Sequence, residues 1–438
     1  NWTASIQDTI VFDNKNFISN TDQLPRTGDR CMNQALQLEH ELAIAPAQQE
    51  EARKEFVSAL RRHVLTTMAT GMRAYYDAND LPEIERSTGA PPTSGPQVHK
   101  AMRREKPFKF FSAVRTSAQE MSFASVITGV ERELDNLNTR AAVLREESDE
   151  SCGSLTLDDS VAIPRNVSEI DVHLTPGCYH SEYAENDTAA GAIYDNALKV
   201  FTFGQMGVEM NDIGATMANY VRLNFPEFKP KKILDSGCTI GHNALPWAEA
   251  FPDAEVYGID VAPGVLRYAH SRARSKGVPV HFQQMNATEM KFEDNSFDVV
   301  FSSMFLHELP LKDIRAFFRE AYRVLKPGGL LWTMELPPNT AMQPYESFYL
   351  DWDSFYNNEP YYKTFRDQDY QELVTSAGFA AEDFLQATLP RYTFVGEEAF
   401  AADLGRPMTF DSQTGRMDPK GTRWYGFGGW KKPAGESA

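Results

Sequence analysis

Short apolar runs alternate with helical patterns through the second half of the chain. Residues 244–250 and 312–325 carry apolar side chains at the three-to-four-residue spacing that is typical of helices. Alternating strands and helices predict an α/β domain built on a parallel sheet. The predicted strands are residues 232–235, 255–260, 280–285, 297–303 and 330–336, with 382–388 and 424–432 as two closing strands.

The first third of the chain is patterned differently, because its apolar positions repeat only at helical spacing. Between residues 56 and 72 an apolar side chain recurs at every fourth position, and a second helical block covers about residues 106–144. Residues 81–98 are rich in proline and glycine and predict a loop between these helices. A short helix is expected around residues 33–44. We therefore expect a helical domain over residues 1–145.

Two stretches outside these patterns indicate the domain organisation. Residues 146–160 are acidic and rich in serine, which is typical of an exposed connection, so we expect a connecting segment over 146–195 and an α/β domain over 196–438. Residues 338–366 form an insertion dense in aromatic side chains. These rings either line a substrate pocket or pack the helical domain onto the sheet, and the sequence leaves both alternatives open.

Composition and charge narrow the range of partners and compartments. The chain has 438 residues, a formal net charge of −18 and four cysteines without metal-type spacing. So acidic a chain is repelled by phosphate backbones and anionic membranes, so neither nucleic acid nor a membrane is expected as a partner. Reduced thiols, the absence of a long apolar stretch and an N-terminus without a signal pattern indicate a cytoplasmic protein.

A glycine-spaced turn follows the first predicted strand. Asp235 ends that strand, and Gly237 and Gly241 allow the backbone to turn sharply and approach a ligand closely. Such a loop binds a nucleotide-like ligand at the carboxyl ends of parallel strands. Asp260, 25 residues after Asp235, could hydrogen-bond both hydroxyls of a ribose, and Asn286 could meet the amino edge of an adenine. A dinucleotide site is disfavoured, because Thr239 stands where that fingerprint requires its second glycine.

These motifs together resemble the class I S-adenosylmethionine (SAM) dependent methyltransferases over roughly residues 195–390. The resemblance implies a Rossmann-like sheet of seven strands, with the last strand inserted antiparallel and an N-terminal helical cap or lid. It also implies SAM as the cofactor. The cofactor-binding residues implied by the matching positions are Asp235, Gly237, Gly241, Asp260, Val261, Asn286, Ala287 and Ser303.

Candidate catalytic residues lie near the ends of the fourth and fifth predicted strands. Methyl transfer from a sulfonium needs an aligned acceptor, and it needs a base only if the acceptor must lose a proton. His307 follows the fourth strand and Glu335 lies near the end of the fifth, so we expect both at the rim where the acceptor binds. His173 and His180 could join His307 around a metal or line the acceptor site. His242 is expected to contact the cofactor or a helix end, and His281 to be structural.

A narrower resemblance concerns the segments around residues 266–270, 280–284, 305–308 and 335–338. They are similar to methyltransferase domains of polyketide synthase loading modules, of the saxitoxin and apratoxin type. That likeness implies C-methylation of a malonyl-type acyl thioester, in some relatives with a divalent metal that stabilises an enolate. It also leaves a carrier protein and a homodimer open as partners.

Three functions are therefore open from the sequence. The leading hypothesis is a SAM-dependent methyltransferase that acts on a small or medium organic acceptor. The second is a metal-assisted C-methyltransferase acting on a malonyl-type acyl thioester. The third is a SAM-binding scaffold or sensor without turnover.

Overall fold

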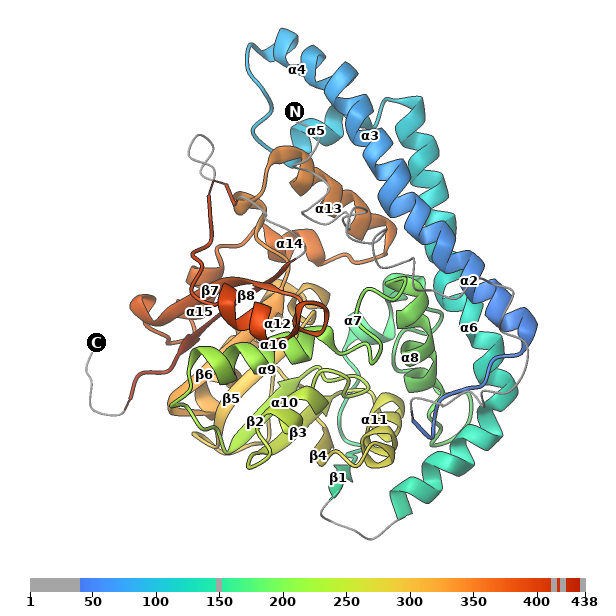
Figure 1. Cartoon of the computed structure of the whole chain (residues 1–438), viewed down its shortest axis with the longest axis vertical. Helices are drawn as coiled ribbons and strands as arrows, with labels where there is room; N and C mark the ends of the chain where they lie inside the picture. The colour runs from blue at the N-terminus through green and yellow to red at the C-terminus, as the bar shows by residue number, and fades with distance from the viewer. Residues whose placement is uncertain (1–39, 147–151, 411–415, 418–422, 434–438) are drawn as a thin grey trace.

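The computed structural model describes residues 40–146, 152–410, 416–417 and 423–433 (Figure 1). Most of the short helix expected at residues 33–44 lies outside these ranges. Its described part, residues 40–44, forms a turn instead of a helix. No helix in the described ranges has both the length and the apolar character needed to cross a membrane.

The centre of the fold is an eight-stranded sheet with the order β1-β4-β3-β2-β5-β6-β8-β7. Strands β1 to β6 pair in parallel, and β8 is antiparallel to both β6 and β7, so the predicted antiparallel insertion of the last strand is confirmed. The strands are β1 Gly153–Thr156, β2 Lys232–Ser236, β3 Glu255–Asp260, β4 Val280–Gln284, β5 Phe297–Ser303, β6 Leu325–Glu335, β7 Phe384–Pro390 and β8 Arg423–Trp430.

The expected number of seven strands was wrong, because β1 adds an eighth strand beside β4. It comes from the connecting segment, where no strand was predicted. Gly153 begins it with φ +83°, and a Cβ at this position would lie 2.1 Å from the carbonyl oxygen of Val280. Only glycine lets the chain enter the sheet edge so closely. The β6 strand also begins earlier than predicted, because residues 326–329 bulge between two pairs of its ladder with β5.

Each face of the sheet has its own apolar core, because side chains alternate along the strands. Ile233 and Val299 point to one face, and their neighbours Leu234 and Val300 point to the other. The first face is covered by α9 Asp212–Asn224, α10 Leu245–Ala250, α11 Pro263–Ser275 and α16 Tyr392–Asp403. The second face is covered by α12 Leu311–Val324 and α15 Tyr370–Thr375.

The N-terminal helices form a long arm along one side of the molecule (Figure 1). A continuous helical path of α2 Gln48–His63, α3 Ala69–Tyr75 and α4 Leu81–Thr88 runs beside the 41-residue helix α6 Lys106–Glu146. The prediction of a loop over residues 81–98 holds only for residues 89–94, because the rest of this stretch forms α4 and the start of α5 Gly95–Met102. Pro96 lies in the first turn of α5, where a missing backbone N–H costs nothing. Pro82 instead follows the π-helical turn Tyr76–Asp80 within the continuous helical path.

The aromatic insertion packs the helical domain onto the α/β domain. It contains α13 Pro344–Tyr356 and α14 Tyr362–Arg366. Trp352 stacks on Phe111 of α6 with ring centroids 4.5 Å apart, and its Nε1 donates to Ser112 Oγ at 2.9 Å. This packing confirms one of the two alternatives for the aromatic side chains. The other edge of α13 faces a cavity.

The connecting segment passes between the arm and the sheet. It contains α7 Arg165–Ser168, a single 3-10 turn at Val172–Leu174 and α8 Ala189–Phe201. The proposed domain boundary between residues 195 and 196 falls within α8. Figure 1 shows α7 and α8 between the long arm and the sheet.

Candidate active site

One cavity of about 380 Å³ extends from the carboxyl ends of the parallel strands to the connecting segment and α13. Its first part is lined by strand-end residues, which include Gly237, Asp260 and Asn286. Its second part is lined by His173, His307 and residues of α13. The two parts form one space, so a ligand at the strand ends would lie next to a ligand beneath α13.

The loop after β2 is held in an unusual backbone conformation. Gly237 has φ +77°, and a Cβ there would lie 2.4 Å from the Phe305 ring. Thr239 has φ +45°, a region that non-glycine residues rarely adopt. The backbone N–H groups of Gly237 and Cys238 donate to the carbonyl of Ile259 at 2.9 and 3.0 Å. This geometry brings the loop across the end of β3 and leaves its outer side facing the cavity.

Asp260 lies at the end of β3 in the cavity wall. One carboxylate oxygen accepts from the backbone N–H of Thr239 at 3.0 Å, and the other accepts from Ala262 N–H at 3.0 Å. Burial in this wall raises the pKa of Asp260 above its ordinary range, although these backbone donors oppose the shift. A carboxylate that is oriented in this way can still accept from a diol, as a ribose requires.

Asn286 lines the same part of the cavity as Val261 and Ala287. Its amide oxygen accepts from both the N–H and the hydroxyl of Thr288 at 2.9 Å. The expected contact with the amino edge of an adenine would need that oxygen. Asn286 therefore offers the cavity its NH₂ group instead.

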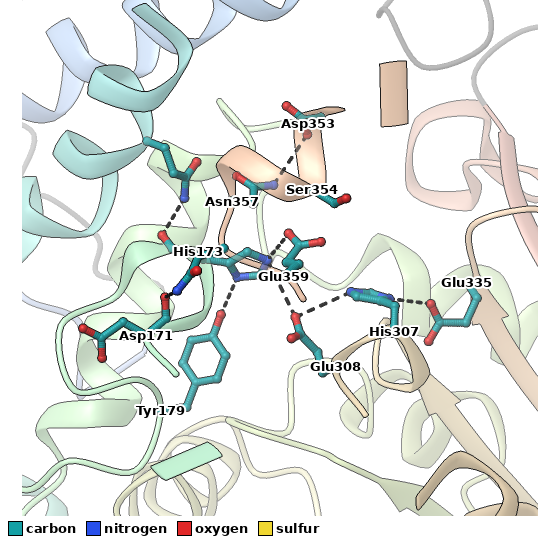
Figure 2. A network of polar contacts seen from close by, with 12 residues as sticks. Asp171, His173, Tyr179, His307, Glu308, Glu335, Asp353, Ser354, Asn357 and Glu359 are labelled. Carbon is teal, nitrogen blue, oxygen red and sulfur yellow. Dashed lines mark hydrogen bonds and ion pairs between the residues drawn. The ribbon is translucent and has the colours of Figure 1, made fainter. Parts of the chain in front are cut away.

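His307 and Glu335 form a buried pair at the second part of the cavity (Figure 2). Nδ1 of His307 lies 2.6 Å from Glu335 Oε2, while Oε1 of Glu335 accepts from the N–H groups of Phe305 and Leu306 at 2.8 and 2.6 Å. Burial lowers the pKa of His307, but Glu335 and the nearby carboxylates outweigh it and raise that pKa to about 10. His307 is therefore an imidazolium at neutral pH.

Two further carboxylates and a second histidine complete this polar cluster, which Figure 2 shows in one view. Nε2 of His173 lies 2.8 Å from Glu359, and its Nδ1 lies 2.5 Å from the Tyr179 hydroxyl. Oε1 of Glu308 lies 3.6 Å from His307 Nε2 and 3.8 Å from His173 Nε2. Glu308 therefore stands between the two imidazoles.

The helical arm reaches this cluster through buried polar side chains. Gln119 of α6 donates from Nε2 to the His173 carbonyl at 2.6 Å, and Arg61 of α2 donates to the Gln119 amide oxygen. Arg115 of α6 donates to Asp353 at 2.6 Å and also to Asn357. The arm thus holds both the segment around His173 and the cavity edge of α13.

Four of the ten non-glycine residues with positive φ in the described ranges belong to the cavity lining. His173, Cys178 and Met304 all have φ between 49° and 56°, in addition to Thr239 with φ +45°. All four residues line the cavity. Such conformations cost of order 1 kcal/mol or more each and cluster at functional sites, where the surrounding packing maintains them.

Comparison with known proteins agrees with this geometry. Residues 233–329 match the sequence profile of the family described as "Methyltransferase domain". These residues form a methyltransferase domain. The matched segment contains the glycine loop, Asp260, Asn286 and His307, which are the positions that the sequence had indicated. The sheet order supports the predicted α/β Rossmann-like fold class.

Curated relatives of this methyltransferase domain act on different acceptors, as their names state. Demethylmenaquinone methyltransferase of Thermus thermophilus is 38% identical over 112 residues, which are 26% of this chain and 50% of the relative. Phosphoethanolamine N-methyltransferase 1 of Arabidopsis thaliana is 33% identical over 188 residues, 41% of this chain and 35% of the relative. The chain thus spans half or less of the length of these relatives.

Among solved structures, a similar one is the Haemonchus contortus phosphoethanolamine N-methyltransferase 2 in complex with SAM. It is 21% identical and has a TM-score of 0.33, with coverage of 53% of this chain and 59% of that chain. A TM-score this low gives no support to an inference about function.

Not every residue predicted for the cofactor site lines the cavity. Ser303 does, and its hydroxyl accepts from Asn243 Nδ2 at 3.0 Å. Asp235 and Gly241 lie behind the cavity wall. Burial, with Asp260 nearby, raises the pKa of Asp235 well above its ordinary range. Gly241 packs so closely on Phe282 that a Cβ would lie 2.7 Å from the ring. Both residues shape the methyltransferase loop from behind.

The five histidines singled out in the sequence fall into three groups. His173 and His307 line the cavity, but His180 does not, so the structure does not bring together the trio expected around a metal. His242 lines the cavity, and burial together with Arg272 lowers its pKa to about 3. His281 lies in β4 beside Ser154, as expected of a structural residue. Within the described ranges, no three or more His, Cys, Asp or Glu residues are grouped so as to hold a metal ion.

Three residues of the polar cluster, Glu308, Tyr179 and Glu359, were missed by sequence reasoning. Glu308 follows His307 directly and could have been found by asking which side chain accompanies the candidate histidine at the strand end. Tyr179 and Glu359 had no such signal, because they come from distant segments that only the folded chain brings together. Glu335 was expected at the rim, but it lies beneath His307 and outside the cavity lining.

Proposed function

We propose that the chain is a SAM-dependent methyltransferase that acts on a small or medium organic acceptor. The observation that carries the proposal is the single cavity. One part has the strand-end carboxylate of Asp260 and the glycine loop, and the other has the His307–Glu335 pair beneath α13. A cofactor and an acceptor in these two parts would be adjacent, as in-line transfer requires.

The residues present fit a nucleoside cofactor of this kind. The carboxylate of Asp260 is oriented by two backbone N–H groups and has no basic side chain among its hydrogen-bond partners in the described ranges, so it is suited to hydroxyl donors. The loop from Gly237 to Asn243 would hold the methionine part, and the NH₂ group of Asn286 would face an acceptor nitrogen of the adenine. SAM supplies an electrophilic methyl group on a sulfonium.

His307 has the second role in the proposal. Its Nδ1–H is fixed on Glu335, so the ring cannot rotate freely and Nε2 is directed away from that carboxylate. An imidazolium in this position orients the acceptor by donating a hydrogen bond from Nε2. α13 and the connecting segment line this part of the cavity, and an interaction in such a partly buried place is stronger than one in bulk water.

The binding half of the proposal is tested by calorimetry with SAM on Asp260→Ala. We expect at least a 100-fold loss of affinity, because two hydrogen bonds to a carboxylate at about 1.5 kcal/mol each are removed. Asp253→Ala is the matched control, since Asp253 is an exposed acid before the same strand. Unchanged affinity in Asp260→Ala, or a preference for a dinucleotide over SAM, would remove the cofactor assignment.

The catalytic half is tested by S-adenosylhomocysteine formation with a panel of phenols, amines, thiols and malonyl-type thioesters. We expect turnover with at least one class, and a loss of turnover with retained SAM affinity in His307→Gln. Tight SAM binding without product from any acceptor would instead favour a SAM-binding scaffold or sensor. Full activity in His307→Gln would remove the role given to this residue.

A further inference from the structure

Glu308 carries an inference that rests on the proposed function and deepens it. We propose that Glu308 is the group that takes a proton from the acceptor, while His307 is a fixed hydrogen-bond donor, so the acceptor is an acidic hydroxyl of the phenol or enol type. Three features support this assignment. They are the contacts of the carboxylates of Glu308, Glu335 and Glu359, the protonation state of His307, and the acidity of a hydroxyl that a carboxylate can deprotonate.

Among the carboxylates of the cluster, Glu308 has the greatest capacity left to accept a proton. Glu335 already accepts from two backbone N–H groups and from His307. Glu359 is engaged by His173 Nε2 at 2.8 Å. The closest imidazole nitrogens to Glu308 are 3.6 and 3.8 Å away, beyond hydrogen-bond distance, and the described part of the chain gives its carboxylate no hydrogen bond.

The backbone of Glu308 is fixed although its carboxylate is open. Its N–H donates to the Phe305 carbonyl at 3.1 Å, and its carbonyl accepts from Asn166 Nδ2 at 3.2 Å. The side chain lies in the cavity wall beside that of His307. An acceptor oxygen between them could receive a hydrogen bond from His307 Nε2–H and give its own proton to Glu308.

His307 is unsuited to remove the proton itself. Glu335 holds the proton on Nδ1, and the neighbouring carboxylates outweigh the effect of burial and raise the pKa of the ring to about 10. Both nitrogens therefore carry protons at neutral pH. A doubly protonated ring donates and does not accept, which leaves Glu308 as the base next to it.

The groups around Glu308 come from several elements, and Tyr362 of α14 packs on the His307 ring beside it with centroids 5.2 Å apart. His307 precedes it on the same 3-10 turn and is paired with Glu335 of β6. His173, Cys178 and Tyr179 face it from the connecting segment, Tyr194 from α8, and Glu359 from the chain after α13. Burial raises the pKa of Glu308, while the two histidines oppose that effect. A carboxylate in these surroundings is a stronger base than an exposed one.

This pairing of groups defines the acceptor class. A carboxylate is too weak a base for an alkyl alcohol, but it can deprotonate a phenol or enol whose oxyanion is stabilised by an adjacent imidazolium. The O–H proton moves to Glu308, and the oxygen keeps the electron pair. That pair forms a bond to the methyl carbon, the C–S bond breaks, and sulfur retains its electrons as the neutral thioether. An enol could instead react at carbon through the same oxyanion.

The experiment uses 4-nitrophenol, whose phenolate absorbs visible light, with protein saturated by S-adenosylhomocysteine. Below the solution pKa of the phenol, we expect wild-type protein to bind it as the phenolate, with an infrared carbonyl band from a newly protonated carboxyl group. Glu308→Gln should bind neutral phenol and lack that band, and Glu308→Asp should retain part of the phenolate signal. The matched control is Glu289→Gln, an exposed acid outside the cavity.

His307→Gln separates the two roles. It should weaken phenolate binding about 10- to 100-fold, as expected for loss of a hydrogen bond to a charged group.

An equal phenolate signal in Glu308→Gln and wild type, or no phenolate in either, would overturn the proposal. Calorimetry with S-adenosylhomocysteine on the same samples distinguishes a failure of the Glu308 assignment from a failure of the cofactor site. Retained binding without phenolate rejects the role of Glu308, whereas absent binding rejects the cofactor site itself. Methylated products of phenols and of 1,3-dicarbonyl compounds then distinguish transfer to oxygen from transfer to carbon.

Discussion

Replacing Glu335 by glutamine tests the electrostatics of the His307 pair at nearly constant shape. The carboxylate accepts from the backbone N–H groups of Phe305 and Leu306 through Oε1, and from His307 through Oε2. A glutamine oxygen can keep both backbone hydrogen bonds. Its NH₂ group then faces His307 Nδ1, which must become an acceptor. The substitution therefore removes one charge and reverses one hydrogen bond.

The magnitude follows from the pKa of His307. Burial lowers this pKa, but the carboxylates raise it from 6.5 to about 10. At 1.36 kcal/mol for each pH unit, this difference is worth about 5 kcal/mol in favour of the imidazolium. Glu335 is the largest of the carboxylate contributions, so without it we expect the His307 pKa to fall to its ordinary value or below.

The change has a defined sign for stability. Because the folded pKa of His307 lies above its unfolded value, its contribution is fully present below pH 6.5 and is lost as pH rises through about 10. The free energy of unfolding of the wild type should therefore decline across that range. In Glu335→Gln this part of the decline should be absent.

The assay is a pH titration of histidine-labelled protein by NMR, with His307→Gln to assign the signal among the nine histidines. We expect His307 to remain protonated at about pH 8 in the wild type and to be neutral there in Glu335→Gln. Urea denaturation of both proteins across the same pH range measures the stability change. A wild-type His307 that titrates near its ordinary value, or the same titration in both proteins, would refute the reasoning.

Two further predictions concern the loop and the arm. Gly237→Ala should lose SAM binding in calorimetry, because a φ of +77° is strained for alanine and the new Cβ would lie 2.4 Å from the Phe305 ring. Gly277→Ala is the control: its φ is +66°, the space around it is open, and SAM binding should be retained. Arg115→Met should lower the free energy of unfolding by about 3–5 kcal/mol in thermal or urea denaturation, since it leaves the Asp353 carboxylate without its buried partner. Adding Asp353→Asn should restore part of that loss, and no recovery would contradict the ion-pair explanation.

The central sheet could be predicted because its signals are local. Each predicted parallel strand is a short apolar run, and each is followed by a turn or a helical pattern that can be found within a few residues. The β1 strand had no such signal. It has four residues, begins at a glycine and pairs along only one edge, with β4. Its place depends on the close approach to Val280, which is a long-range contact.

The prolines of residues 81–98 show a second limit. A proline stops a helix in its interior but is well placed in its first turn. Which case applies depends on where the helix begins. At Pro96 a helix begins just before the proline, whereas Pro82 directly follows the π-helical turn Tyr76–Asp80 within a continuous helical path, so neither proline prevents helix formation.

Some residues of the candidate site also have a local signal in the sequence, and others depend on long-range contacts. Asp260 and His307 could be predicted because each follows a recognisable strand, and strand ends of a parallel sheet share one edge. The position of Glu335 beneath His307, and not beside the acceptor, depends on the direction of a side chain at the end of β6. Tyr179 and Glu359 reach the cavity only through the fold of the connecting segment and of the chain after α13.

The acceptor part of the cavity draws its residues from several segments of the chain. The methyltransferase domain of residues 233–329 supplies Asp260, His307 and Glu308, so the cofactor part and the proposed proton transfer are built from one segment. His173 and Glu359 lie outside that segment, and the arm holds the His173 backbone through Gln119. The wall that faces the acceptor is therefore set by packing between the arm, the connecting segment and α13. Relatives that match this chain mainly through the methyltransferase domain can share its cofactor chemistry while binding different acceptors, because the residues that shape the acceptor part come from elsewhere in the chain.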